Sequence, residues 1–418
     1  MYQKSVLGNG LRVVTGSMTH VRSVSIGVFV GAGSRYERAE QAGISHFIEH
    51  ICFKGTLRRP TAKEIAESIE GVGGLLNGAT DKELTIYWCK VARPHFPLAV
   101  DLLADMLSYS KFDPDDVEKE RQVITEEINM CLDSPQHRVD LLIDEVVWPD
   151  QPLGMDVAGT KTTVGKLTRE DMRCYCDTQY LANNTVVSVA GDVAHEEVVD
   201  TLERAFGHWK RDVRQEWQPA NIQQEPRFRV EHRDTEQAHL CLAMPGCSIV
   251  HPDRFIVDLL NAVLGEGMSS RLFLEIREKK GLAYAIHSYT NHFQDAGQLT
   301  IYAGIDPKQL SACVEAILAE LRRLKERIPE DELTKAKEFC KGRLMLRMED
   351  TRSVIGWLGG QELLLGSIRD VDQVVSIIDS IQVDDLVRVA EELLVLENLK
   401  AAVVGPVSDD DIEGLLRP

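Results

Sequence analysis

The sequence predicts an α+β protein of two homologous domains, each a mainly antiparallel sheet packed with helices. Three observations lead to this prediction. The chain has 418 residues, more than one hydrophobic core usually organises. A helix-and-strand pattern recurs after about 214 positions, which is typical of an internal duplication. Strands and helices are also interspersed within each half of the chain, which favours helices packed against an antiparallel sheet, the α+β class.

The elements of the first half can be read in order. The Asn9-Gly10 dipeptide between apolar segments predicts a β-hairpin turn. Residues 23–30 alternate in polarity as a strand does. Residues 84–91 are rich in β-branched and aromatic side chains, and they also predict a strand. Residues 96–108 and 115–131 show the spacing of helices.

The repeat defines the domain boundaries. In both halves a helix precedes an apolar strand, at residues 185–193 and again at 399–407. The polar stretch between the halves has no periodicity and reads as a linker. We therefore expect a first domain over 1–207, a linker over 208–226 and a homologous second domain over 227–418.

Composition excludes several classes of protein. The net charge of −19 argues against nucleic acid as a partner, since phosphate binding needs a basic surface. No apolar run is long enough to span a bilayer, so no membrane association is expected. The nine cysteines are scattered, which favours reduced thiols over a disulfide framework. The N-terminal residues lack the pattern of an export signal, so we expect a cytoplasmic protein.

Residues 46–50 carry the pattern His-x-x-Glu-His. Residues four apart share one face of a helix, so His46 and His50 can bind one ion through their imidazoles. Glu49 lies beside them, placed to take a proton from water at the metal without itself binding the ion. Catalytic zinc takes three protein ligands, so a third is required.

With this motif the sequence resembles the pitrilysin/insulinase metallopeptidase family (M16), in particular its short-chain processing-peptidase branch (M16B). The family has a ligand Glu at the end of an E-R-x-V-I-x-x-E helix, which falls here on Glu127. Glu126 is the competing candidate, but it points to another side of that helix. Glu120 matches the family acid that orients a ligand His; the alternative for Glu120 is a surface ion pair.

Residues 73–80 are similar to the family's edge strand, which pairs with extended substrate through main-chain hydrogen bonds. The alternative is a plain glycine-rich turn before the strand at 84–91. The edge strand implies substrate binding at four residues: Asn77, Gly78, Ala79 and Thr80.

The second half has no comparable ligands. Ser270, Phe273 and Leu274 stand opposite the three motif residues, and Lys341 stands opposite Glu127. The resemblance instead implies that this half contributes Arg277, to bind a substrate carbonyl, and Tyr284, to donate to the oxyanion. From the residues alone, an ordinary surface Arg and a half-buried Tyr would be the default interpretation.

The resemblance implies the LuxS/MPP-like metallohydrolase fold and a zinc-dependent endopeptidase with one Zn²⁺ per chain. Its substrates would be peptides or unfolded segments held extended in an enclosed chamber. Such a chamber needs four domains, so a homodimer or a heterodimer with a related subunit is expected. Alternatives are a non-catalytic processing-peptidase-like subunit that binds peptides or partner chains, and an unrelated metal hydrolase.

Substrate preference does not carry over from the presequence-cleaving relatives. Their helix acids that select a basic residue are replaced here by His137 and Leu141. Asp140 and Asp144 lie close by in the sequence and could substitute for them.

Overall fold

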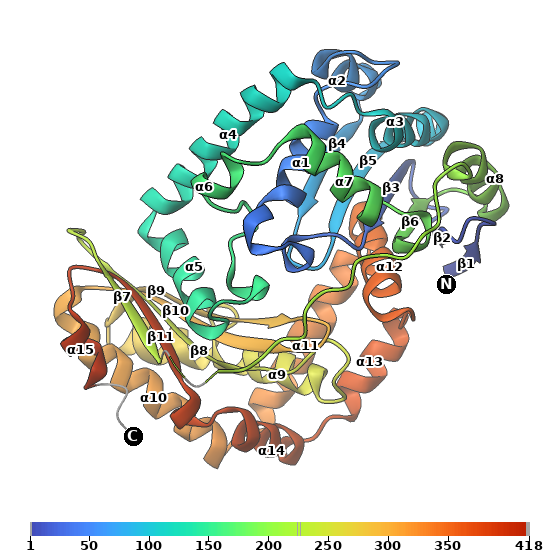
Figure 1. Cartoon of the computed structure of the whole chain (residues 1–418). Coiled ribbons are helices and arrows are strands. Elements are labelled where there is room, and N and C mark those ends of the chain that lie inside the picture. The colour runs from blue at the N-terminus through green and yellow to red at the C-terminus, as the bar shows by residue number, and fades with distance from the viewer. Residues whose placement is uncertain (1, 224, 226, 415–418) are drawn as a thin grey trace. The chain divides into compact units, whose positions relative to one another are not determined.

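The structure, a computed structural model, describes residues 2–223, 225 and 227–414, and it contains two β-sheets (Figure 1). Each sheet belongs to one of two units, and neither unit is a continuous stretch of chain. Unit 1 is built from Met1–Asn129, Asp156–Gln218 and Met345–Asp370. Unit 2 is built from Met130–Met155, Pro219–Leu344 and Val371–Pro418.

The sheet of unit 1 has the strand order β1-β2-β6-β3-β5-β4. Only β2 and β6 run parallel; the other neighbours are antiparallel. The predicted Asn-Gly turn joins β1 to β2, and the Leu7 N–H donates to the Leu11 carbonyl across it at 2.9 Å. The strands are β1 (Tyr2–Val6), β2 (Arg12–Ser17), β3 (Ser23–Val30), β4 (Leu75–Thr80), β5 (Thr85–Ala92) and β6 (Thr185–Gly191).

The sheet of unit 2 has the order β7-β11-β8-β10-β9. It repeats the order β2-β6-β3-β5-β4 of unit 1 strand for strand, including the single parallel pair, here β7 with β11. The strands are β7 (Phe228–His232), β8 (Ala238–Pro245), β9 (Ala283–His292), β10 (Gly297–Ile305) and β11 (Lys400–Gly405). The predicted α+β class with two homologous domains is therefore confirmed.

Helices cover both sheets, and the predicted helices at 96–108 and 115–131 are α3 and α4. Those that lie wholly or mainly in unit 1 are α1 (Ile44–Cys52), α2 (Ala62–Glu70), α3 (Phe96–Tyr109), α4 (Pro114–Asp133), α6 (Lys161–Val164), α7 (Arg169–Gln179), α8 (His195–Phe206) and α12 (Thr351–Leu365). Those of unit 2 are α5 (Pro135–Val147), α9 (Arg254–Leu264), α10 (Leu310–Glu326), α11 (Glu330–Arg347), α13 (Val371–Ser380), α14 (Val383–Leu393) and α15 (Asp409–Glu413).

The two halves of the chain exchange one helix each. Helix α12 comes from the second half but packs on β3 and β6 of unit 1. Helix α5 comes from the first half but packs on β8 and β11 of unit 2. The expected domain ranges 1–207 and 227–418 describe two copies along the chain. They stay a prediction, because the packed units place the segments that contain α5 and α12 with the opposite half of the chain.

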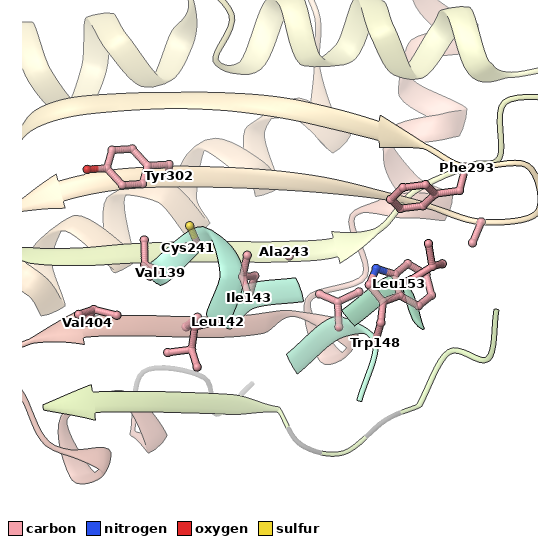
Figure 2. Packing of buried hydrophobic residues seen from close by; sticks show 13 residues of the cluster. Val139, Leu142, Ile143, Trp148, Leu153, Cys241, Ala243, Phe293, Tyr302 and Val404 are labelled. Atoms are coloured by element: carbon pink, nitrogen blue, oxygen red, sulfur yellow. The ribbon is translucent and has the colours of Figure 1, made fainter. Parts of the chain in front are cut away.

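Hydrophobic burial holds α5 on its sheet. Leu142 and Ile143 of α5 are fully buried against side chains of β8, β10 and β11, as Figure 2 shows. Trp148, directly after the helix, is also buried, and its indole N–H donates to Gln298 Oε1 at 2.9 Å. Pairing this N–H lets the whole indole be buried without the cost of an unsatisfied donor.

Three further observations bear on the sequence expectations. No disulfide links any of the nine cysteines, all of which lie in the described part of the chain. Among the residues that the structure describes, no helix has the length and apolar character needed to cross a membrane. In the predicted linker 208–226, the described residues from 210 onward form no helix or strand.

Candidate metal centre

Helix α1 presents the His-x-x-Glu-His motif, and a buried carboxylate fixes where the helix begins. Glu37 accepts hydrogen bonds from the backbone N–H groups of Gly43 at 2.7 Å and Ser45 at 2.8 Å. These are donors that the first turn of a helix leaves unpaired. Gly43 itself has φ of 95°, in the region that favours glycine. Burial raises the pKa of Glu37 to about 7, although the bonds from Ser45 and Gly43 act in the opposite direction.

Three donor groups converge beside this helix. The Nε2 atoms of His46 and His50 lie 3.2 Å apart. Oε2 of Glu127, on α4, lies 3.8 Å from His46 Nε2 and 3.6 Å from His50 Nε2. Within the described residues this is the single cluster of His, Cys, Asp or Glu side chains whose ligand atoms gather so closely. The structure thus brings together the three residues that the sequence suggested as metal ligands.

The group fits a zinc ion. Ligand atoms bound at about 2.0–2.1 Å around a tetrahedral ion lie roughly 3.3–3.4 Å apart, near the 3.2 Å between the two imidazoles. Burial lowers the pKa of His46 to about 4, with His50 as a second cause, so this ring is neutral and able to donate a lone pair at neutral pH. Two imidazoles and one carboxylate are a common donor set for catalytic zinc.

Glu120 orients one of the two rings. Its Oε2 lies 3.1 Å from His50 Nδ1, and its Oε1 pairs with Lys54 Nζ at 2.7 Å. Glu120 is 5% exposed, whereas Lys54 is partly exposed, so only the carboxylate of this ion pair is buried. A carboxylate at Nδ1 holds the proton on that nitrogen and leaves Nε2 free to bind a metal. This contact is the one that the expected role of Glu120 requires, and the role itself stays a prediction.

The alternative ligand does not join the group. Glu126 is exposed, whereas its neighbour Glu127 is partly buried and faces the imidazoles. Their different positions follow from the helix, in which adjacent residues point about 100° apart.

Glu49 is held between α1 and the edge of the sheet. Its Oε2 accepts a hydrogen bond from the Thr80 hydroxyl at 2.6 Å. Burial raises the pKa of Glu49, and the bond from Thr80 partly offsets that rise. A carboxylate with a raised pKa next to a metal group has the properties of a general base.

Strand β4 is an edge strand, as the resemblance implied. It pairs with β5 on one side, and no described strand pairs with its other side. Its side chains alternate: Asn77 and Ala79 are exposed, while Gly78 and Thr80 are partly buried. Asn77 Oδ1 accepts the Gly78 N–H at 2.8 Å.

Arg277 and Tyr284 lie side by side in unit 2. Arg277 belongs to a seven-residue π-helix (Phe273–Lys279), a rare geometry that is frequent at functional sites. Its guanidinium carbon lies 4.8 Å from the centre of the Phe273 ring and 5.7 Å from that of Tyr284. Tyr284 is 76% exposed, so its hydroxyl is accessible to a ligand.

The two acids suggested for substrate selection have partners on the sheet of unit 2. Asp140 accepts hydrogen bonds from the Tyr289 hydroxyl at 3.1 Å and from Cys241 Sγ at 3.4 Å. Asp144 accepts one from Gln298 Nε2 at 2.9 Å. A basic substrate side chain would have to compete with these bonds, so selection by Asp140 or Asp144 stays a prediction.

Two contacts at the site were missed from the sequence. Glu37 lies outside the few positions from which a residue usually caps a helix, so only folding brings it to α1. From the sequence, Thr80 was expected to bind substrate, whereas in the structure its side chain forms a hydrogen bond with Glu49. Its alternation with Asn77 along the strand could have indicated that it faces inward.

Comparison with known proteins gives consistent results. Residues 12–161 match the family model for insulinase (peptidase family M16), and residues 166–339 match that for the peptidase M16 inactive domain. The chain is 38% identical to an uncharacterized zinc protease, YmxG, of Bacillus subtilis, over 97% of this chain and 98% of the relative.

Solved structures share the fold. The crystal structure of a protease from Helicobacter pylori aligns with a TM-score of 0.92 at 25% identity, over 97% of this chain and 99% of that one. A chain of complex III2 from Candida albicans aligns with a TM-score of 0.86 at 21% identity, over 99% of each chain.

Proposed function

The chain belongs to peptidase family M16, the insulinase family, and we propose that it is a zinc-dependent endopeptidase acting on extended peptides or unfolded polypeptide segments. The observation that carries the proposal is the convergence of His46, His50 and Glu127 beside Glu49. The names of the relatives support it, since the Bacillus protein is called a zinc protease and the Helicobacter protein a protease.

The roles follow from the chemistry of each group. His46, His50 and Glu127 would hold one zinc ion per chain, which as a Lewis acid polarises the scissile carbonyl and makes water more acidic. Glu49 accepts the proton of the attacking water and passes it to the leaving amine. Glu120 keeps His50 in the tautomer that binds metal.

In this proposal the substrate is bound by main-chain groups of β4 and by two side chains of unit 2. The free side of β4 offers backbone groups to an extended peptide, with Asn77, Gly78, Ala79 and Thr80 along the strand. Arg277 binds a substrate carbonyl and Tyr284 donates to the developing oxyanion, the roles that family resemblance assigns to this pair. Their adjacency in unit 2 supports a joint role.

We also propose an enclosed chamber formed with a second chain, because four domains are needed and this chain supplies two. The partner is a second copy or a related subunit. A cytoplasmic location remains part of the same proposal.

Replacing Glu49 with Gln tests the proposed reaction. The amide keeps the shape of the side chain but cannot accept a proton, so hydrolysis of a fluorogenic peptide should fall by about 10²–10⁴-fold. Zinc content, measured by elemental analysis, should remain at one per chain. Glu126→Gln, on the exposed side of α4, is the matched control and should keep both zinc and activity. Undiminished hydrolysis by Glu49→Gln would refute the mechanism.

A further inference from the structure

Thr80 and Gly78 occupy the inward face of β4, next to the carboxylate of Glu49. We propose that Thr80 is a positioning residue, whose hydroxyl fixes the orientation of Glu49, while the missing side chain of Gly78 provides the space that Glu49 occupies. The inference rests on the proposed function, because it concerns how that reaction's base is held.

The hydroxyl contact is short. Thr80 Oγ1 donates to Glu49 Oε2 at 2.6 Å, and the pair is partly buried. This separation is at the short end of the range for hydrogen bonds between two oxygen atoms. Threonine is also β-branched, so its side chain has few rotamers and its hydroxyl stays where the strand puts it. The bond therefore restrains a flexible glutamate from a rigid support.

Gly78 contributes by having no side chain. A Cβ atom on Gly78 would lie 2.9 Å from both Cγ and Oε1 of Glu49 and 3.1 Å from its Cδ. Any side chain there would push the carboxylate away from the strand. Residues i and i+2 of a strand face the same side, so Gly78 and Thr80 act on Glu49 together.

This arrangement separates two tasks on one strand. The inward side chains hold the base, whereas the main chain on the free edge of β4 remains available to pair with a peptide. A peptide paired with β4 is then held by the same strand that holds Glu49. The strand thereby couples the register of the substrate to the position of the base.

The test compares Thr80→Val, which has the same shape without the hydroxyl, with Thr80→Ser, which keeps the hydroxyl. We expect Thr80→Val to lower kcat for a fluorogenic peptide about tenfold or more, with KM within about twofold and zinc retained. The separate variant Thr80→Ser should keep kcat within about threefold of that of the original protein. Thr201→Val on α8 is the matched control, since among the described residues the Thr201 hydroxyl bonds only within its own helix. The kcat of this variant should not change.

Three results would overturn the proposal: an unchanged kcat in Thr80→Val, a raised KM with kcat intact, or an equal loss in Thr80→Ser. The second result would make Thr80 a substrate-binding side chain instead. If Thr80→Val fails to fold, Gly78→Ala examines the same claim, and it should lower kcat while zinc is retained; unchanged kcat would again refute it.

Glu49→Gln in the same assay keeps the two proposals apart. Loss of hydrolysis in Glu49→Gln with full activity in Thr80→Val refutes the positioning role alone. If the zinc-loaded original protein cleaves no peptide, the proposed function fails, and the positioning role fails with it.

Discussion

Units 1 and 2 share one strand order, yet their helices carry different chemistry at equivalent places. Helix α1 of unit 1 is a regular α-helix whose first turn is bound by Glu37, and it presents two imidazoles. The equivalent segment of unit 2 is a π-helix that carries Phe273 and Leu274 at the positions opposite Glu49 and His50. Because the sheets agree and the donors do not, the fold and the metal site are separable properties of this chain.

The third ligand position shows the same contrast. Glu127 on α4 faces the two imidazoles, whereas Lys341 on α11 pairs with Glu338 and Asp379, each at 2.7 Å. An ammonium held by two acids satisfies its own charge and offers no lone pair to a cation. Unit 2 has therefore kept the helix and lost the ligand.

The exchanged helices also differ in how they are held. Helix α5 buries a cluster of aliphatic and aromatic side chains on the sheet of unit 2. Helix α12 instead comes close to the sheet of unit 1 through glycine: a Cβ on Gly359 would lie 2.3 Å from a carbon of the Phe29 ring. The α5 contact depends on filled volume and the α12 contact on the absence of a side chain. Removing atoms should therefore destabilise the first contact, and adding atoms should destabilise the second.

The largest expected effect is on zinc affinity, and it distinguishes Glu127 of unit 1 from Lys341 at the equivalent position of unit 2. Glu127→Gln replaces an anionic ligand by a neutral amide, so zinc affinity should fall by more than the roughly 10–100-fold caused by losing an outer hydrogen-bond partner. Competition with a chromogenic chelator measures this affinity. Lys341→Gln, at the equivalent position of unit 2, should leave both affinity and stoichiometry unchanged. Similar losses in both variants would contradict the assignment of the site to unit 1.

The next largest effect is a loss of stability when a side chain between α5 and its sheet is shortened. Leu142→Ala leaves a cavity in the buried cluster shown in Figure 2 and should lower the free energy of unfolding by about 2–5 kcal/mol. Urea denaturation followed by circular dichroism measures the loss. His137→Ala on the exposed side of the same helix is the control and should change stability by less than about 0.5 kcal/mol.

A smaller effect on stability is expected at α12, where the substitution adds volume instead of removing it. Gly359→Ala places a methyl group against Phe29 and should cost about 1–3 kcal/mol through overpacking. Gly360→Ala has nothing within 4 Å of the new Cβ and should stabilise the helix by about 0.5–1 kcal/mol. Thermal unfolding of the two neighbours distinguishes packing from helix propensity. Equal shifts in the same direction would show that α12 does not pack closely on β3.

The smallest effect is local. Removing zinc with a chelator should speed amide hydrogen exchange in α1 and in the middle of α4, since a ligand that binds only the folded site stabilises it. The π-helix and α11 should exchange at the same rate with and without metal. Changes confined to unit 2 would place the metal elsewhere.

Much of the site was predictable because its signals are local. The spacing of His46, Glu49 and His50 on one helix and the family pattern around Glu127 identified three residues whose ligand atoms the structure brings together. They also identified Glu49, whose carboxylate interacts electrostatically with His50 and Glu127. Strands such as β3 were predictable from alternation, and β4 from the resemblance of residues 73–80 to the family's edge strand. In each case the information lies within a few residues along the chain.

By itself, the sequence determined the class of the fold, its duplication and the residue types offered to a metal, because periodicity and motif spacing are properties of neighbouring positions. Tertiary structure alone decided that Glu37 caps α1, that Thr80 restrains Glu49 and that α5 and α12 pack on the sheet of the opposite half. The contacts of Thr80, α5 and α12 join residues far apart in the chain, and Glu37, six and eight residues from the N–H groups that it binds, reaches them only through the fold of the intervening segment. They depend on burial and on the pairing of polar groups, which exist only once the chain has folded.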